Sequence, residues 1–200
     1  PIFVSPFWIN QNIFYEISEK IKLRDNLGIA INDYLIGSFQ RDTEGSDLKS
    51  PKLIKGPDRF IKIVKHYYKS NKNVEVILTG KRRQYVIKEL DNAGIPYHYF
   101  EMISFEDLNN LYNLLDLYVV SSRTEGGPQA IMECAITKTP IISTNVGIAP
   151  EILSTKSIFD MKNFHEAKPD IKHAFEQARR YTIPEGFEEF KSLLSEIYED

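Results

Sequence analysis

The stretch Ser122-Arg-Thr-Glu-Gly-Gly-Pro-Gln-Ala-Ile-Met-Glu133 decides the fold, because it joins a predicted buried strand to a predicted helix. The strand is the mostly apolar run over residues 114–120, which is rich in strand formers, as expected where both faces of a sheet are covered. The helix is predicted over residues 128–136, with Pro128 near its first turn, where a missing N–H is tolerated. This order predicts a strand–turn–helix unit.

Two glycines and two acids mark the turn of this unit. Gly126 and Gly127 let a ligand approach the backbone closely, and the N–H groups at the helix start favour an anion. Glu125 precedes the glycines and Glu133 lies within the helix. Open parallel sheets bind ligands at the carboxyl edge of their strands, so both acids are expected to face one ligand there. From the residues alone, two ordinary exposed acids are an equal alternative.

The composition is that of an ordinary globular domain. The 200 residues suffice for one domain with a substantial core, and 42% hydrophobic with 26% charged residues argues against disorder. The net charge of −3 gives no support for a nucleic-acid partner. The single cysteine, Cys134, excludes an internal disulfide and a Cys-rich metal site, and we expect it to be a small buried residue.

The apolar runs and the first residue of the chain indicate what kind of protein it belongs to. No run of apolar residues is long enough for a membrane-spanning helix. The chain starts at Pro1 without a Met or a signal peptide, so we expect it to be part of a longer protein.

Predicted strands and helices alternate along the chain. Strands are expected at residues 2–5, 34–39, 74–79, 97–100, 114–120, 140–143 and 157–159. Helices are expected at residues 16–27, from 55–58 onward, and at 82–93, 104–114, 128–136, 164–181 and 185–198. This alternation indicates an α/β fold, with a Rossmann-like open parallel sheet and helices on both faces. The loops that would gather at one edge are residues 40–56, 80–82, 101–104, 121–128 and 144–149.

Two cations belong to one predicted crossover. Arg41 follows the first central strand and Lys55 precedes the next helix, so both can reach the same edge. An arginine offers bidentate contacts and a lysine a point charge, which together with a helix start would suit a diphosphate. The alternative is that both are solvated surface cations, as expected for most of the 25 Lys and Arg residues.

Several familiar motifs are missing from the sequence. None of the four histidines has a second histidine or an acid at a metal-ligand spacing. There is no Gly-x-Ser-x-Gly elbow, no Walker lysine motif and no Gly-x-Gly-x-x-Gly fingerprint. The last absence argues against an NAD-dependent dehydrogenase.

The blocks that remain resemble a known family. Residues 116–133, with two glutamates separated by seven residues, resemble the signature of retaining glycosyltransferases of family 4. Residues 139–151 resemble the next block of that family, while residues 36–41 and 55–56 resemble its Gly-Arg and Lys-Gly elements. The resemblance spans about residues 2–155 and implies the GT-B fold. Residues 1–200 would then be the C-terminal, donor-binding domain, with the N-terminal acceptor domain outside this chain.

The resemblance implies three catalytic residues. Arg41 and Lys55 would hold the donor diphosphate and stabilise the charge that develops on the leaving group. Glu125 would contact the donor sugar near the reacting centre. The chain departs from the family here, because residues 42–54 form a long polar insertion where the family has a short spacer.

Five further residues would bind the donor. The resemblance implies that Glu133 hydrogen-bonds the ribose hydroxyls of the nucleotide. Backbone N–H groups around Gly126, Gly127 and Gln129 would contact sugar and phosphate oxygens. Gly37 would leave room for the diphosphate near the strand end.

The activity implied is retaining transfer of a hexosyl group from a UDP- or GDP-sugar. The acceptor would be a glycan or glycolipid bound through the N-terminal domain, in polysaccharide or glycolipid biosynthesis, and the isolated domain would be inactive. The resemblance implies no cofactor and no metal, because cationic side chains and helix-start amides neutralise the diphosphate. It implies a cytoplasmic location, with peripheral association of the full-length protein at the inner face of the membrane left open.

Two other functions stay open at this stage. One is a GT-B relative with other chemistry, such as a sugar-nucleotide epimerase. The other is a non-catalytic Rossmann-like binding module. The paired glutamates favour transfer over epimerisation, and the set of Arg41, Lys55, Glu125 and Glu133 argues against a degenerate site. Affinity for a nucleotide sugar separates the first two functions from the third.

Overall fold

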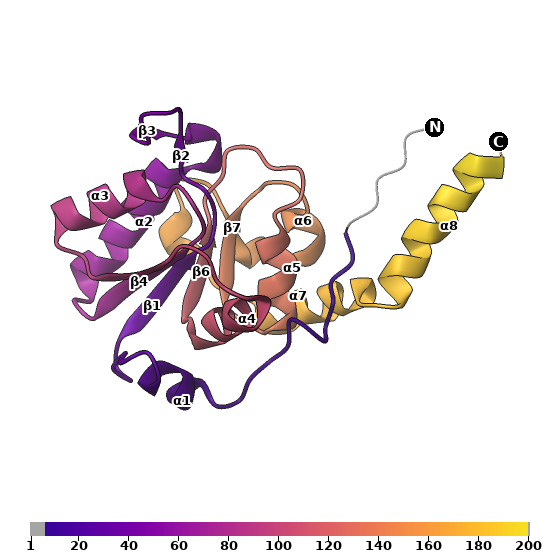
Figure 1. Ribbon diagram of the computed structural model, residues 1–200, viewed down its shortest axis with the longest axis horizontal. Helices are drawn as coiled ribbons and strands as arrows, with labels where there is room; N and C mark the ends of the chain where they lie inside the picture. The colour runs from indigo at the N-terminus through magenta and orange to yellow at the C-terminus, as the bar shows by residue number, and fades with distance from the viewer. Residues whose placement is uncertain (1–6, 200) are drawn as a thin grey trace.

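The computed structural model describes residues 7–199, and its centre is a six-stranded parallel sheet with helices on both faces (Figure 1). The sheet strands are β1 (Tyr34–Ser38), β4 (Val74–Thr79), β5 (Tyr97–Phe100), β6 (Leu117–Val120), β7 (Ile141–Thr144) and β8 (Ile158–Phe159). A separate antiparallel hairpin consists of β2 (Thr43–Glu44) and β3 (Ser50–Pro51). The predicted fold class is therefore confirmed.

Helices fill most of the connections. The α-helices are α1 (Lys20–Asp25), α2 (Pro57–Ser70), α3 (Gln84–Ala93), α4 (Phe105–Leu114), α5 (Gln129–Ile136), α6 (Ala149–Ile152), α7 (Ile171–Ala178) and α8 (Glu185–Glu199). Short 3-10 helices are η1 (Leu53–Lys55), η2 (Thr155–Ser157), η3 (Phe164–Glu166) and η4 (Arg179–Tyr181). No helix within residues 7–199 is both long and apolar enough to cross a membrane.

The strands are apolar on both faces because each face is covered. In β6, Tyr118 and Val120 pack into the core beneath α4 and α5, whereas Leu117 and Val119 pack into the core beneath α2 and α3. Successive side chains of a strand point to opposite faces, so one short strand serves both cores. Cys134 of α5 is fully buried in the first core, as expected for a small apolar residue.

The strand order places a crevice at one edge. The order is β5-β4-β1-β6-β7-β8, and every pairing is parallel. The chain runs outward from β1 through β4 and β5, then crosses back to β6 on the other side of β1. Ligands of open α/β sheets bind where the order reverses, beyond the carboxyl ends of the strands. That place lies between the loops that follow β1 and β6.

Local signals explain most of the boundaries. Ser104 caps α4 as predicted, because its Oγ accepts a hydrogen bond from the Asp107 N–H at 3.0 Å. The single helix predicted over residues 164–181 is wrong: the chain forms η3, α7 and η4 there. Pro169 interrupts the helix, and Asp170 restarts it by accepting from the His173 N–H at 3.1 Å.

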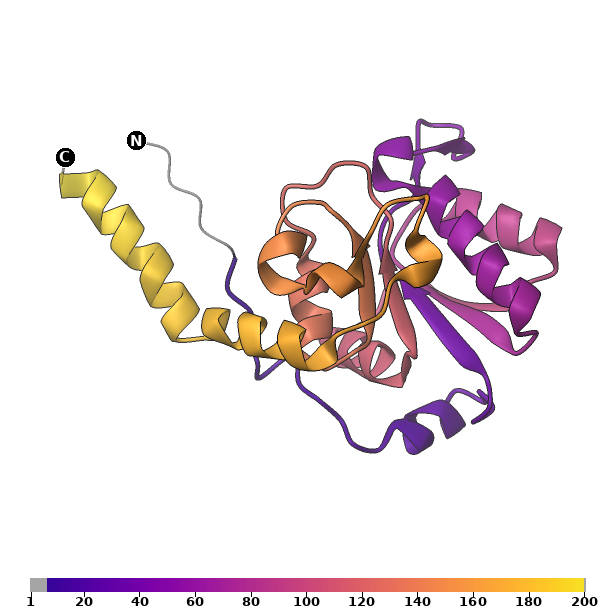
Figure 2. The same cartoon turned by 180° about the vertical axis from the view of Figure 1, so that it is seen from behind.

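The remaining differences are at the ends of elements. The helix predicted over residues 16–27 is shorter, at α1, and the strand predicted over 114–120 begins later, because Leu114 ends α4. The strand predicted at residues 2–5 lies outside the described residues. At the other end, α8 extends away from the sheet (Figures 1 and 2), and Trp8 packs on Phe187 and Phe190 with ring centroids 5.1 Å apart.

Candidate functional site

A cavity of about 370 Å³, here called the edge cavity, opens at the carboxyl ends of β1 and β6. Its lining comes from the loop after β1, the corner after β6, and helices α4 and α5. Five of the eight predicted site residues line it: Lys55, Glu125, Gly127, Gln129 and Glu133. The structure therefore brings together residues from two loops that are far apart in the sequence.

Lys55 and Glu125 form an ion pair in this cavity. The Lys55 Nζ lies 2.5 and 2.6 Å from the two carboxylate oxygens of Glu125. The Ser122 Oγ donates a further hydrogen bond of 2.9 Å to the same carboxylate. The side chains are 28% and 12% exposed, so the pair is accessible from the cavity without being fully solvated. A partly desolvated cation of this kind is available to an anionic ligand if Glu125 releases it.

The backbone after Lys55 is held against the end of β6. Gly56 has φ +65°, and a Cβ on it would lie 1.9 Å from the Ser121 carbonyl oxygen. The Ser121 Oγ donates to the Gly56 carbonyl at 2.9 Å, and the Arg123 N–H donates to the Ile54 carbonyl at 2.8 Å. This close contact between the two loops sets where Lys55 can reach.

Glu133 lies at the floor of the edge cavity. Its carboxylate is 9% exposed and accepts a hydrogen bond from the Tyr112 hydroxyl at 2.5 Å. Burial raises the pKa of Glu133, and the hydrogen bond from Tyr112 opposes that shift. The carboxylate thus offers an acceptor to a hydroxyl-bearing ligand at the start of α5.

The Gly-Gly corner is open. A Cβ added to Gly126 or Gly127 would meet no atom within 4 Å. The N–H groups of Gly126, Gly127 and Gln129 donate to no other residue within the described part of the chain. Gln129 is exposed and begins α5, so its amide belongs to a helix N-terminus, which suits an anion.

Arg41 and Gly37 lie elsewhere. Arg41 is exposed, donates from its Nε to the Thr43 carbonyl at 2.9 Å, and is not among the residues that line the edge cavity. Gly37 is inside β1 rather than at its end, where a Cβ would lie 2.3 Å from a Leu115 side-chain atom. The strand continues beyond Gly37 to Ser38. The missing Cβ of Gly37 leaves room for the Leu115 side chain.

Sequence reasoning missed two residues of the site. Gln40 lines the edge cavity, and its Nε2 donates to the Lys55 carbonyl at 2.9 Å. Tyr112, which binds Glu133, comes from α4. Gln40 had a signal, since it directly precedes Arg41 after a strand, but Tyr112 had none because it is one of several aromatic residues on an amphipathic helix.

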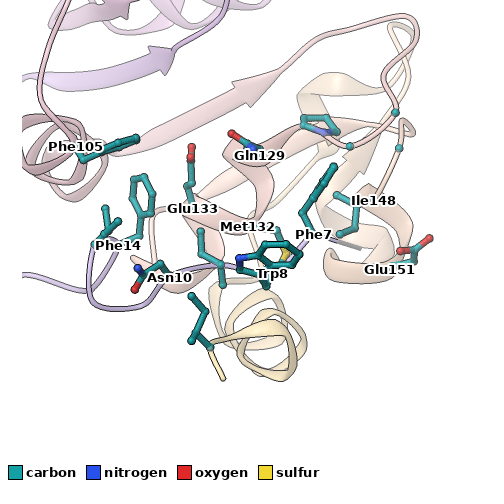
Figure 3. Close-up of a pocket in the computed structure, with 17 residues that line it drawn as sticks. Phe7, Trp8, Asn10, Phe14, Phe105, Gln129, Met132, Glu133, Ile148 and Glu151 are labelled. Carbon is teal, nitrogen blue, oxygen red and sulfur yellow. The ribbon is translucent and has the colours of Figure 1, made fainter. Parts of the chain in front are cut away.

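A second cavity of about 580 Å³ adjoins the first. Its walls are mostly apolar, with Phe7 and Trp8 near Met132 on one side and Phe14 near Phe105 on the other (Figure 3). The two cavities share the start of α4, the corner and the first turns of α5, with the common residues Phe105, Gly127, Pro128, Gln129 and Glu133. Within residues 7–199, no three His, Cys, Asp or Glu side chains group as ligands for a metal ion.

Several solved structures share this fold. Sucrose-phosphate synthase from Thermosynechococcus elongatus matches with a TM-score of 0.74 at 14% identity, over 96% of this chain and 52% of that chain. Alr3699/HepE from Anabaena, solved with UDP-glucose, matches with a TM-score of 0.71 at 18% identity, over 94% and 56%. The chain thus spans about half the length of both proteins.

A third neighbour corresponds to a single domain. The C-terminal domain of a group 1 glycosyltransferase, LpcC from Francisella tularensis, matches with a TM-score of 0.69 at 16% identity, over 88% of this chain and 99% of that chain. No curated protein sequence matches this chain significantly. The family model described as glycosyl transferases group 1 matches residues 51–184, which contain the Lys-Gly element, the corner and α5. The chain therefore belongs to the group 1 glycosyltransferase family.

Proposed function

We propose that this chain binds a nucleoside-diphosphate sugar in the edge cavity and serves retaining transfer of its hexosyl group, as in glycosyltransferases of family 4. The observation that carries the proposal is the Lys55–Glu125 pair beside an open Gly-Gly corner with unpaired amides. Two structures of HepE, solved with UDP-glucose and with UDP, support the ligand class.

The leaving group is the centre of the proposed mechanism. Lys55 turns from Glu125 to the diphosphate, and the corner amide of Gly127 and the helix-start amide of Gln129 add partial positive charge. Together they stabilise the charge that develops as the sugar–phosphate bond breaks, so the proposal requires no metal or cofactor. Arg41 would join them after its exposed side chain releases the Thr43 carbonyl, which now accepts from its Nε.

Two carboxylates bind the sugar and the ribose of the donor. Glu125, once released by Lys55, contacts the donor sugar near the reacting carbon. Glu133 accepts hydrogen bonds from the ribose hydroxyls, with Tyr112 orienting its carboxylate. Retention follows if the acceptor attacks from the face of the leaving group, a step that depends on positioning and on leaving-group electrostatics.

The acceptor belongs to the part of the protein outside this chain. Two of the neighbouring structures are about twice as long, which supports an acceptor domain facing the edge cavity. We propose a glycan or glycolipid acceptor in polysaccharide or glycolipid biosynthesis, at a cytoplasmic location or the inner face of a membrane. Both UDP and GDP remain donors to test.

Calorimetric titration with UDP and with GDP tests the proposal. One nucleotide is expected to bind, and Lys55→Ala and Glu133→Ala should each weaken it about tenfold, or about 1.4 kcal/mol. Lys49→Ala is the matched control, because Lys49 is an exposed lysine of the same crossover that lines neither cavity. Absence of binding to both this chain and the full-length protein at millimolar nucleotide would contradict the proposal.

A further inference from the structure

We propose that Arg83 is a positioning residue for Lys55, acting through Gln40. Arg83 holds the backbone of Gln40, and the Gln40 side chain holds the backbone of Lys55 at the edge cavity. The inference rests on the proposed function, in which Lys55 is the cation of the diphosphate site. It also assigns a purpose to the insertion over residues 42–54.

The guanidinium of Arg83 joins the ends of two strands. Arg83 follows β4 and is 1% exposed. Its Nη1 donates to the Gln40 carbonyl and, at 3.3 Å, to the Thr79 carbonyl, while its Nη2 lies 3.4 Å from the Ser38 Oγ. A rigid planar fork of this kind fixes several acceptors at once, which a single amine cannot do. The loop after β1 is therefore anchored to the end of β4.

A buried acid holds the fork in place. The Asp42 Oδ2 lies 2.8 Å from the Arg83 Nε, and the two side chains are 2% and 0% exposed. Burial raises the pKa of Asp42 and lowers that of Arg83, and the attraction between the two charges opposes both shifts. Apolar residues often fill such a place at no loss of stability, so packing alone gives no reason for a buried ion pair. The need to hold the Arg83 guanidinium in one orientation does give a reason for the buried ion pair.

The Gln40 side chain links the anchored loop to the backbone of Lys55. Its Nε2 donates to the Lys55 carbonyl at 2.9 Å, and its Oε1 lies 3.4 Å from the Ser122 Oγ. That hydroxyl in turn donates to the Glu125 carboxylate at 2.9 Å. The Ser122 hydroxyl has a single proton, which goes to Glu125, so the hydrogen bond from Gln40 supports the Lys55 member of the pair.

The insertion provides a second connection, from the backbone beside Arg83 to Lys55. The N–H groups of Asp42 and Thr43 both donate to the Arg82 carbonyl at 3.1 Å, which fixes the start of the insertion. The Lys52 N–H donates to the Asp42 carbonyl at 2.7 Å, which fixes its end. Between these points the chain leaves and returns as the β2–β3 hairpin. Because both ends of the insertion are fixed by hydrogen bonds, the position of Lys55 at the carboxyl edge of the sheet is fixed as well.

A double-mutant cycle on this chain tests the inference. Arg83→Lys keeps the charge beside Asp42 but removes the fork that holds Gln40. It should weaken binding of the nucleoside diphosphate about three- to tenfold, or about 0.7–1.4 kcal/mol. In the Lys55→Ala background the same change should have no further effect on affinity, because Arg83 acts through Lys55. Loss of fold stability alone would not produce this dependence on Lys55.

A second variant and a control guard against a folding defect. Gln40→Ala, at a half-buried residue, should reproduce the loss and should not add to Arg83→Lys. Lys81→Gln is the control, since Lys81 is an exposed cation two residues from Arg83 and lines neither cavity. Unchanged affinity in Arg83→Lys and in Gln40→Ala, or equal losses with and without Lys55, would overturn the inference while leaving the donor site intact. No binding by the unmodified chain or the full-length protein would overturn the proposed function and this inference together.

Discussion

The two loops that form the edge cavity are built in opposite ways. The corner after β6 is short, the Cβ positions of Gly126 and Gly127 face open space, and three of its amides have no partners among the described residues. The crossover after β1 is long and cross-linked: Arg83 binds Gln40, Lys52 binds Asp42, and Gly56 is pressed against Ser121. Both loops end at the same ligand-sized space.

The difference corresponds to what each loop contributes. The corner contributes backbone amides, and the Gln129 amide is oriented by the helix that it begins, so no long flexible side chain has to be aimed there. A lysine has a long flexible side chain, so its direction depends on where its backbone is fixed. The crossover therefore carries bonds that hold one residue, Lys55, whereas the corner offers a ligand three backbone amides that have no partner among the described residues.

The largest expected effect is at the contact between the loops. Gly56→Ala should destabilise the chain by about 3 kcal/mol or more, because the new Cβ would overlap the Ser121 carbonyl in a left-handed backbone. Gly28→Ala is the control: Gly28 has φ +68° but open space, so only about 1–2 kcal/mol of left-handed strain is expected. Chemical denaturation measures both, and equal losses would show that the close contact is unimportant.

A smaller effect is expected at Glu133, the buried acid of the corner helix. A carboxyl whose pKa is raised in the folded state favours folding while protonated, and that contribution is lost as the pH rises through its folded pKa. Glu133→Gln should therefore raise the free energy of unfolding at pH 7 by about 0.5–1 kcal/mol, while Tyr112 keeps an acceptor. Denaturation at several pH values should show the gain shrinking as the pH falls through the raised folded pKa of Glu133, and levelling off below about pH 4.3, the usual value of an exposed Glu. A gain that grows on acidification would contradict this.

The smallest expected effect on stability is at the corner. Gly126→Ala should leave the free energy of unfolding unchanged within about 0.5 kcal/mol, since its φ is not left-handed and its Cβ would meet nothing. The same change should weaken nucleotide binding, because the methyl group would occupy space in front of the amides. Denaturation and calorimetry on one variant separate the two outcomes. A large loss of stability would erase the contrast between the two loops.

Much of the fold could be predicted from local patterns. The apolar run before the corner, Pro128 at the helix start and the Ser104 cap each depend on residues a few positions apart. The same holds for Lys55, Glu125 and Glu133, which were predicted as site residues and do line one cavity. Such signals are local because strand and helix periods repeat within a few residues.

Other features depended on distant contacts. Arg41 stood in a suitable block, but the insertion turns its guanidinium to Thr43 and leaves Gln40 at the cavity. Gly37 was expected to leave room for the diphosphate near the strand end, and in the structure a Cβ on it would meet a Leu115 side-chain atom. Neither outcome is visible from spacing, because it depends on which neighbour in the sheet or loop packs against the residue.

The sequence by itself determined the α/β class, the order of elements and the chemistry available at the carboxyl edge. Periodicity, turn residues and residue types are properties of the chain before it folds. Only the tertiary structure decided which groups are paired: Lys55 meets Glu125 across 70 residues, and Arg83 meets Gln40 across 43. Hydrogen bonds and ion pairs act over a few ångströms, so which of them form is settled when sheet order and loop packing bring distant segments together.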